Sequence, residues 1–250
     1  VYKHKQIVDF NFGNGYLVPD KSTFHNLGWL NYDDLTVNPN SNVASVLCDL
    51  KWPNGEDMEE YPRTMCKRLL KVLRDEFNLD FYSSFEPEFF LLQSDGVNKA
   101  LENRELYMSI KPVYSGSEMY KTMKMEKFEK FFIQTDKYMQ ENDINIQDFS
   151  AENGPGQVEM PLLPEFGIKA ADDYFILKQS VKEIARKNDM FATFMTKPLA
   201  SSDISSGCHY NHSLWSVYDK RKNAMFDGND RLFDFNLHHI ESQRPMGPKS

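Results

Sequence analysis

Cysteine is scarce in this 250-residue chain, which contains Cys48, Cys66 and Cys208 and has no C-x-x-C pair. An odd number of cysteines without close pairing favours a reducing compartment over a disulfide framework. The sequence also lacks a basic leader and any apolar run of about 18 residues. We therefore expect a cytoplasmic protein with no membrane partner. The first residue is Val1 rather than Met, which predicts that the chain is a fragment.

Basic charge is in deficit, because 29 Lys and Arg stand against 37 Asp and Glu, giving a formal net charge of −8. This balance does not favour a nucleic-acid partner, since such proteins present basic surfaces. Aromatic residues make up 14% of the chain, which argues against disorder. An acidic protein can still bind phosphate groups through metal ions, so a phosphate-handling function stays open.

Hydrophobic periodicity predicts helices and strands of moderate length, which favours an α+β or α/β domain. Leu69, Leu70 and Leu73 repeat at helical spacing after Pro62, a residue suited to the first turn of a helix. The first predicted helix begins at Pro62 and has an apolar stripe that reaches Phe77; the others span about 125–141 and about 168–188. The predicted strands span about 80–92, 157–162 and 191–195. Residues 93–120 are expected to be irregular, and residues 201–214 to form a loop leading into a strand.

The two ends of the chain differ from its middle. The first 50 residues alternate short apolar runs with turn residues, so we expect a small β-rich unit. Asn14-Gly15 predicts a hairpin, and residues 43–48 predict another strand. Residues 240–250 have no periodicity and are expected to form a disordered tail.

The motif Phe-Glu-Pro-Glu-Phe-Phe at residues 85–90 places two carboxylates two positions apart. Residues so spaced in a strand share a face, so Glu86 and Glu88 should project together, opposite Phe85 and Phe89. Neighbouring half-buried carboxylates repel each other, and a bound cation removes that cost. The alternative is an exposed edge strand with two solvated glutamates, which Pro87 makes plausible.

A second acidic motif, Ala-Glu-Asn-Gly-Pro-Gly-Gln-Val-Glu, occupies residues 151–159. Gln157 and Glu159 should share a strand face, and the Gly-Pro-Gly turn can return Glu152 towards Glu159. The alternative is an ordinary loop with exposed glutamates. Two such motifs in one chain make a metal site more plausible than either motif alone.

The third motif, Ser-Gly-Cys-His-Tyr-Asn-His-Ser-Leu at residues 206–214, adds His209 to the carboxylates. One imidazole among carboxylates suits Mg²⁺ or Mn²⁺, and two such ions can clamp a phosphoryl group during its transfer. The spacing of Cys208, His209 and His212 is too tight for a usual zinc finger. A polar core histidine is the alternative interpretation of His209.

In their order and combination, these motifs resemble the catalytic domain of the glutamine synthetase superfamily. The resemblance covers roughly residues 30–230 and includes Pro62-Arg63 and residues 192–198. The form of the second and third motifs is most similar to the lengsin branch, the lens glutamine synthetase-like proteins.

The resemblance implies roles for individual side chains. Glu88, Glu152 and Glu159 would hold a first Mg²⁺ or Mn²⁺ ion beside the amino-acid substrate. Glu86 and His209 would hold a second ion beside the phosphates of ATP, a position left incomplete in this chain. Further candidates on the substrate or nucleotide side are Gly207, Asn211 and Ser213. No residue is assigned as catalytic.

The resemblance also implies a fold and a reaction. The fold is a partial β-grasp-like region at residues 1–54, followed by a C-terminally incomplete catalytic domain at residues 55–239, built from an antiparallel sheet with helices. The reaction activates glutamate as γ-glutamyl phosphate at the expense of ATP, and ammonia then displaces the phosphate. Family members form homo-oligomeric rings with sites between subunits.

Departures from the family pattern concern the substrate side. Ile204-Ser205 replaces the Asn-Gly of active members, and Asn211 stands at the second histidine position, with His212 one residue further on. After the histidine motif only three arginines follow, none in a matching context; these are Arg221, Arg231 and Arg244. Phosphoryl transfer requires cations that are positioned in advance.

Two functional hypotheses follow. The first is a lengsin-like protein without ligase turnover that acts as a structural, chaperone-type or cytoskeleton-associated component. The alternative is an ATP-dependent glutamate–ammonia or glutamate–amine ligase. A metal- or nucleotide-binding protein without turnover lies between them. The altered segment at Ile204-Ser205 motivates the first hypothesis, and the complete carboxylate set motivates the second.

Overall fold

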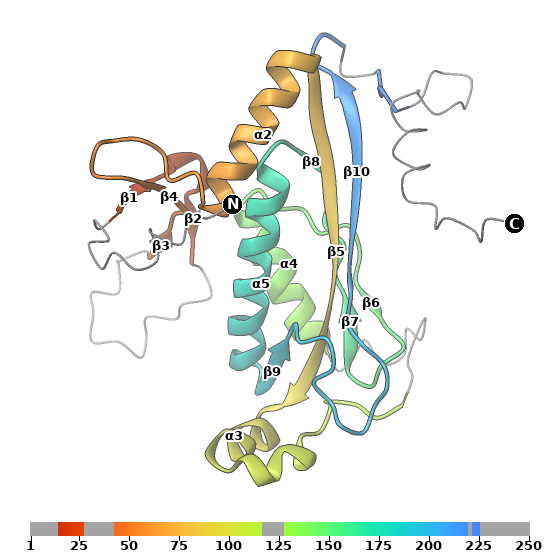
Figure 1. Ribbon diagram of the computed structural model, residues 1–250. Coiled ribbons are helices and arrows are strands. Elements are labelled where there is room, and N and C mark those ends of the chain that lie inside the picture. Colours follow the sequence, from red (N-terminus) through yellow and green to blue (C-terminus); the bar gives the residue numbers. More distant parts are fainter. Residues whose placement is uncertain (1–14, 28–42, 117–127, 220–221, 226–250) are drawn as a thin grey trace, which may run out of the picture.

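The computed structural model describes residues 15–27, 43–116, 128–219 and 222–225 (Figure 1). The helices are α2 (Pro62–Phe77), α3 (Ser94–Glu102), α4 (Glu129–Glu141) and α5 (Lys169–Lys187), with 3-10 turns at η1 (Lys21–Thr23) and η3 (Arg104–Ser109). The strands are β1 (Tyr16–Pro19), β2 (His25–Asn26), β3 (Ala44–Ser45), β4 (Cys48–Lys51), β5 (Leu79–Gln93), β6 (Ser150–Ala151), β7 (Gln157–Glu159), β8 (Glu165–Phe166), β9 (Met190–Thr193) and β10 (Cys208–Ser216).

Strand β5 is the centre of the main sheet. It pairs with β10, β7, β8 and β9, in every case antiparallel, and β6 continues the sheet beyond β7. Helices α2, α4 and α5 lie on one side of β5 and β10 (Figure 1). The predicted α+β class, an antiparallel sheet with helices, is confirmed.

The core lies between β5 and the helices α4 and α5. Phe89 and Leu91 point into it from β5 and are fully buried, as are Val181 and Ala185 of α5 and Met139 of α4. The opposite face of the same strand carries Phe90 and Leu92, which join a smaller apolar cluster with α3. Strand β5 is thus covered on both faces at this end, and this holds the neighbouring carboxylates in a fixed frame.

Several predicted boundaries were wrong. Residues 93–120, expected to be irregular, contain α3 and η3; α3 is only nine residues long and begins with Ser94, Asp95 and Gly96, residue types that favour turns. Strand β10 begins at Cys208, inside the predicted loop, because pairing with β5 orders a segment whose side chains are mostly exposed. Strand β7 ends at Glu159 rather than at residue 162.

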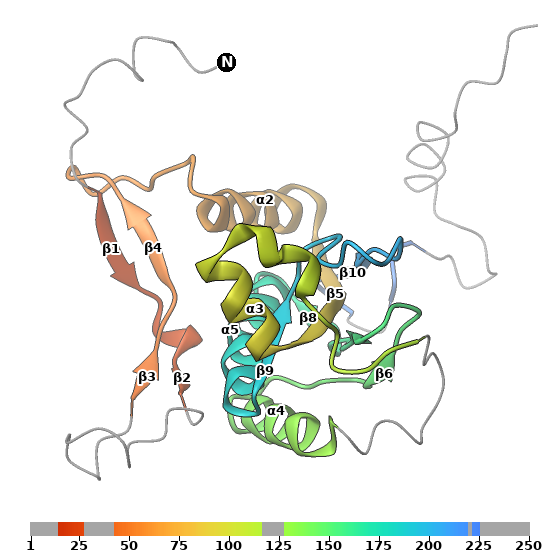
Figure 2. The same cartoon turned by 90° about the horizontal axis from the view of Figure 1, so that it is seen from below.

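The N-terminal strands lie to one side of the helices (Figure 2). Strand β1 pairs with β4, and β2 pairs with β3, so the predicted strand at 43–48 is divided between β3 and β4. The predicted hairpin at Asn14-Gly15 and the predicted tail at residues 240–250 lie outside the described residues, in whole or in part. The division into a β-grasp-like region and a catalytic domain remains a prediction.

Arg63 ties these N-terminal strands to the helices. Its guanidinium donates to both carboxylate oxygens of Asp172 on α5, at 2.9 and 2.8 Å, and to Asp20 at 2.8 Å. It also donates to Asp49 of β4. Lys67, one turn further along α2, donates to Asp20 and Asp49 at 2.9 and 2.7 Å. The Arg63 side chain is only 9% exposed, so an internal network of charges joins three parts of the chain.

Acid should weaken this connection. Hydrogen bonds from Lys67, Ser22 and Arg63 hold the pKa of Asp20 far below its ordinary 3.8; at Asp49, burial raises the pKa but Lys67 and Arg63 outweigh it. A carboxylate with a depressed folded-state pKa contributes stability above its unfolded pKa and loses it as the pH falls through the folded value. Lys67→Met removes one donor to both carboxylates. Its loss of unfolding free energy should therefore be largest at pH 7 and become smaller below about pH 4. Urea unfolding at several pH values measures it; a pH-independent difference would contradict the expectation.

Helix α2 has an apolar stripe as predicted, yet none of its residues is buried. A cavity of about 480 Å³ separates this stripe from the sheet; its lining includes Leu69, Leu70 and Leu73 of α2, Phe81 of β5 and Leu214 of β10. The described residues therefore leave an apolar groove between α2 and the sheet. Within the described part of the chain, we find no helix with the length and apolar character of a membrane span.

Candidate functional site

The three sequence motifs meet where β10, β5 and β7 lie side by side. Antiparallel pairing places His209 opposite Glu86 and Glu159 opposite Glu88. Glu86 and Glu88 share one face of β5, as the two-residue spacing predicts, while Phe89 is buried on the other face. The central strand thus presents one acidic face to both of its neighbours.

Glu86 is held by two side chains from β10. His209 Nδ1 lies 3.2 Å from Glu86 Oε2, and Asn211 Nδ2 donates to Glu86 Oε1 at 2.6 Å. His209 and Asn211 are two residues apart in the strand and therefore share a face. This arrangement brings Glu86 and His209 together, and it gives Asn211 a contact with the acidic site.

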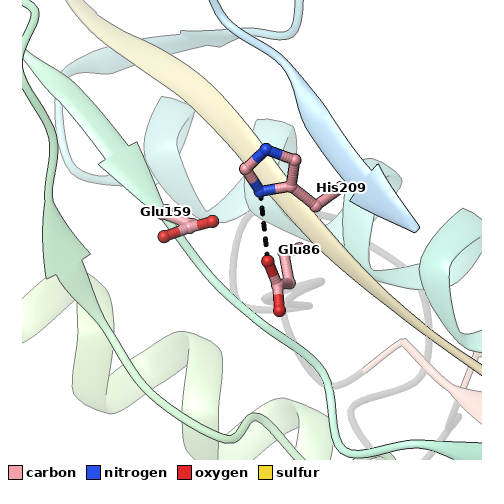
Figure 3. A group of neighbouring side chains, drawn as sticks. All are labelled: Glu86, Glu159 and His209. Atoms are coloured by element: carbon pink, nitrogen blue, oxygen red, sulfur yellow. Dashed lines mark hydrogen bonds and ion pairs between the residues drawn. The ribbon is translucent and has the colours of Figure 1, made fainter. Parts of the chain in front are cut away.

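Figure 3 shows Glu86, Glu159 and His209 converging from three different strands. One ligand atom from each of them lies within 4.8 Å of the other two. The family resemblance assigned Glu159 to one ion and the pair Glu86 and His209 to another. In the structure Glu159 lies beside Glu86 and His209, so the ligand sets expected for the two ions adjoin each other.

Glu88, which pairs with Glu159 across β5 and β7, is held by two hydrogen bonds. Its Oε2 accepts hydrogen bonds from Gln157 Nε2 at 2.8 Å and from the Gly207 backbone N–H at 3.0 Å. Gly207 therefore contacts a carboxylate of the site through its backbone.

Glu152 follows β6 and is brought back towards β7 by the Gly-Pro-Gly turn. Its backbone N–H donates to the carbonyl of Gln157 at 2.9 Å. This places Glu152 near Glu159, as the turn predicts, and the Glu152 charge raises the pKa of Glu159.

The electrostatics of Glu159 show that the site is short of positive charge. Burial, followed by the charges of Glu152, Glu86 and Glu88, raises the pKa of Glu159 to about 7, and His209 opposes this only weakly. Carboxylates gathered at a partly buried point repel each other unless a cation or a proton is shared. Oxygen ligands with one imidazole suit Mg²⁺ or Mn²⁺, so the residues present fit a divalent ion.

Strand parity separates the remaining residues of β10. His212 lies on the face opposite to His209 and Asn211, where it stacks on Phe81 at 5.5 Å. It also lines the apolar groove under α2, so it cannot replace a ligand on the acidic face. Ser213 accepts a hydrogen bond from Trp215 Nε1 at 2.8 Å. The structure thus gives Ser213 a local partner and no contact with the carboxylates among the described residues.

Gln157 is a functional candidate that sequence reasoning noted only for sharing a face with Glu159. Its side chain is 1% exposed and reaches Glu88, the Gly154 turn and the segment around Ser205. The available sequence signal was a glutamine inside a carboxylate motif, but the partners of this glutamine lie 48 and 69 residues away in sequence.

The three arginines that follow the histidine motif, Arg221, Arg231 and Arg244, lie outside the described residues.

Comparison with known proteins finds relatives in the glutamine synthetase family. The family model described as "Glutamine synthetase, catalytic domain" matches residues 59–241. A glutamate–isopropylamine ligase of Pseudomonas sp is 33% identical over 198 residues, covering 79% of this chain and 40% of that protein. A glutamine synthetase of Methanococcus voltae is 26% identical, covering 89% of this chain and 43% of that protein.

Solved structures show the same fold. A novel glutamine synthase homologue superimposes with a TM-score of 0.73 at 18% identity, covering 92% of this chain and 48% of that one. An ADP complex of GmaS gives a TM-score of 0.69 at 22% identity, covering 85% of this chain and 44% of that one. The chain thus spans less than half the length of these relatives.

Proposed function

Because the chain belongs to the glutamine synthetase catalytic-domain family, we propose that it supplies the metal-binding face of an ATP-dependent carboxylate–amine ligase. The observation that carries this proposal is the convergence of Glu86, Glu159 and His209 within 4.8 Å on adjacent strands. Matched relatives are named as ligases that join glutamate to isopropylamine or as glutamine synthetases. Glutamate and an amine are accordingly the substrates we propose.

We propose Mg²⁺ or Mn²⁺ as the cofactor, held by Glu86, Glu159 and His209, with Glu88 and Glu152 as further ligands. When bound, such an ion neutralises negative charge on the phosphate oxygens of ATP. The chain itself provides the frame. Paired strands fix Glu86 opposite His209, and Asn211 restrains the second oxygen of Glu86.

Turnover tests this function. Full-length protein given ATP, Mg²⁺ or Mn²⁺ and glutamate should release inorganic phosphate only when an amine is added. Ammonia, methylamine and isopropylamine form a suitable panel, because they share the nucleophilic nitrogen and differ in apolar bulk. Glu88→Ala should lower the rate at least about 100-fold, more than the loss for residues that only contact ligands. A rate independent of amine and unchanged in Glu88→Ala would overturn the proposal.

A second candidate is a lengsin-like protein without turnover, which serves as a scaffold or chaperone with cytoskeletal partners. Ile204-Ser205 favours it, because an apolar Ile204 stands where the family pattern has asparagine. The orientation of His212 away from the acidic face favours it as well. In that case Mn²⁺ and ATP would bind without phosphate release in the same assay.

We further propose a cytoplasmic homo-oligomeric ring, as the family resemblance implies. Mass photometry of the full-length protein would contradict the ring if it gave a monomer at micromolar concentration.

A further inference from the structure

Gln157 is buried beside Glu88 of the acidic site. Its side chain is 1% exposed, although a primary amide carries two donors and two acceptor positions. Burying an amide is unfavourable unless its polar atoms find hydrogen-bond partners. The partners of Gln157 therefore explain why a glutamine is tolerated there.

The amide of Gln157 joins three separate segments. Its Nε2 donates to Glu88 Oε2 at 2.8 Å and to the Ser205 carbonyl at 3.2 Å, and lies 3.4 Å from Ser206 Oγ. Its Oε1 accepts from the Gly154 N–H at 2.9 Å. Acceptors surround the nitrogen and a donor faces the oxygen. Glutamate has no N–H for Glu88, and methionine satisfies neither side, so this environment specifies glutamine.

Gly154 makes room for this amide. A Cβ at this position would lie 2.7 Å from Gln157 Oε1 and 2.9 Å from Phe90 Cε1. It would also lie 3.1 Å from Ile204 Cγ2. The glycine turn, the buried amide and the segment 204–206 are thus fitted to one another.

Glu88 is oriented by this arrangement. Gln157 Nε2 and the Gly207 N–H both donate to Oε2. Neither bond involves the other carboxylate oxygen, Glu88 Oε1. Groups that hydrogen-bond to a metal ligand fix its orientation and are worth about 10–100-fold in metal affinity.

We propose that Gln157 is a positioning residue, which holds the Glu88 carboxylate and the segment 205–207 in one arrangement. Through it, the turn at Gly154 and the segment after Ile204 are coupled to the carboxylate. The effect on a divalent cation rests on the proposed function, whereas the restraint on residues 205–207 rests on the hydrogen bonds alone.

Two measurements on the full chain test this inference. In Gln157→Met, Mn²⁺ affinity measured by calorimetry should fall about 10–100-fold. Hydrogen exchange of a peptide covering residues 205–207 should become faster, because the Gly207 N–H loses a fixed acceptor. The matched control is Thr135→Val: Thr135 is fully buried and donates to the Phe131 carbonyl of its own helix. It should lose comparable stability and change neither readout.

Each outcome decides the inference. If Gln157→Met keeps the wild-type Mn²⁺ affinity, or keeps the slow exchange of residues 205–207, the inference is overturned while the proposed function stands. If the wild type itself binds no Mn²⁺, the proposed function fails, and the exchange of residues 205–207 decides the inference alone. If Gln157→Met does not fold, Gly154→Ala displaces the same amide and carries the test.

Discussion

Glu159→Gln should weaken Mn²⁺ binding strongly and at the same time stabilise the metal-free protein. The variant removes a proposed ligand, so we expect Mn²⁺ affinity to fall at least about 100-fold, beyond the range for residues that only support ligands. It also removes a charge that Glu152, Glu86 and Glu88 repel. Metal titration by calorimetry and thermal unfolding in a chelator measure the two effects, which have opposite signs.

The sign of the stability effect follows from the pKa of Glu159. In the folded chain it is about 7, above its ordinary 4.5, so ionisation costs folding free energy as the pH rises between these values. Glutamine avoids that cost, and at pH 8 we expect a gain of about 1 kcal/mol after allowing for solvent screening. The gain should vanish below about pH 4.5.

The matched control for this prediction is Glu183→Gln. Glu183 lies on α5 and pairs with Arg186 at 3.2 Å, away from the carboxylate cluster. Its replacement should leave Mn²⁺ affinity unchanged and change stability by less than about 1 kcal/mol. A Glu159→Gln protein that binds Mn²⁺ as tightly as the wild type would remove Glu159 from the site.

Arg63→Met should destabilise the fold by about 3–5 kcal/mol, the range expected when one partner of a buried charge network is removed. The loss leaves Asp172, with a side chain only 10% exposed, without its bidentate partner. Asp20 and Asp49 keep Lys67, so the connection between the N-terminal strands and α2 is weakened rather than removed. Urea unfolding at pH 7 measures the change.

Arg68→Met provides the comparison within the same helix. Arg68 pairs with Glu59 at 3.0 Å, but both side chains are at least half exposed, so the pair is worth only about 0–1 kcal/mol. Equal losses of stability in the two variants would show that helix propensity, and not the buried network, accounts for the effect of Arg63.

The sequence predicted local features well where side chains repeat. The apolar stripes of α2 and α5 specified both helices nearly to the residue. Alternation also assigned Glu86 and Glu88 to one face of β5, because successive side chains of a strand point in opposite directions. Helix α3 was missed since it is short and begins with Ser94, Asp95 and Gly96, which are common in turns.

Which strands become neighbours was decided by the tertiary structure. Nothing local in the sequence states that β10 pairs with β5 in the register that sets His209 opposite Glu86. The same register turns His212 towards Phe81 and away from the carboxylates. Pairing between segments more than 100 residues apart depends on the shared core, and a shift by one residue would exchange the two faces.

The family resemblance, the secondary structure around the motifs and an excess of carboxylates that suits a divalent cation could all be recognised in the amino-acid sequence. How these residues are arranged in space became clear only from the packed fold. It brought Glu159 to Glu86 and His209, and placed the buried amide of Gln157 against Glu88. Hydrophobic periodicity reports only on residues a few positions apart in sequence. Burial and charge repulsion at the site arise only when strands that are distant in sequence pack together.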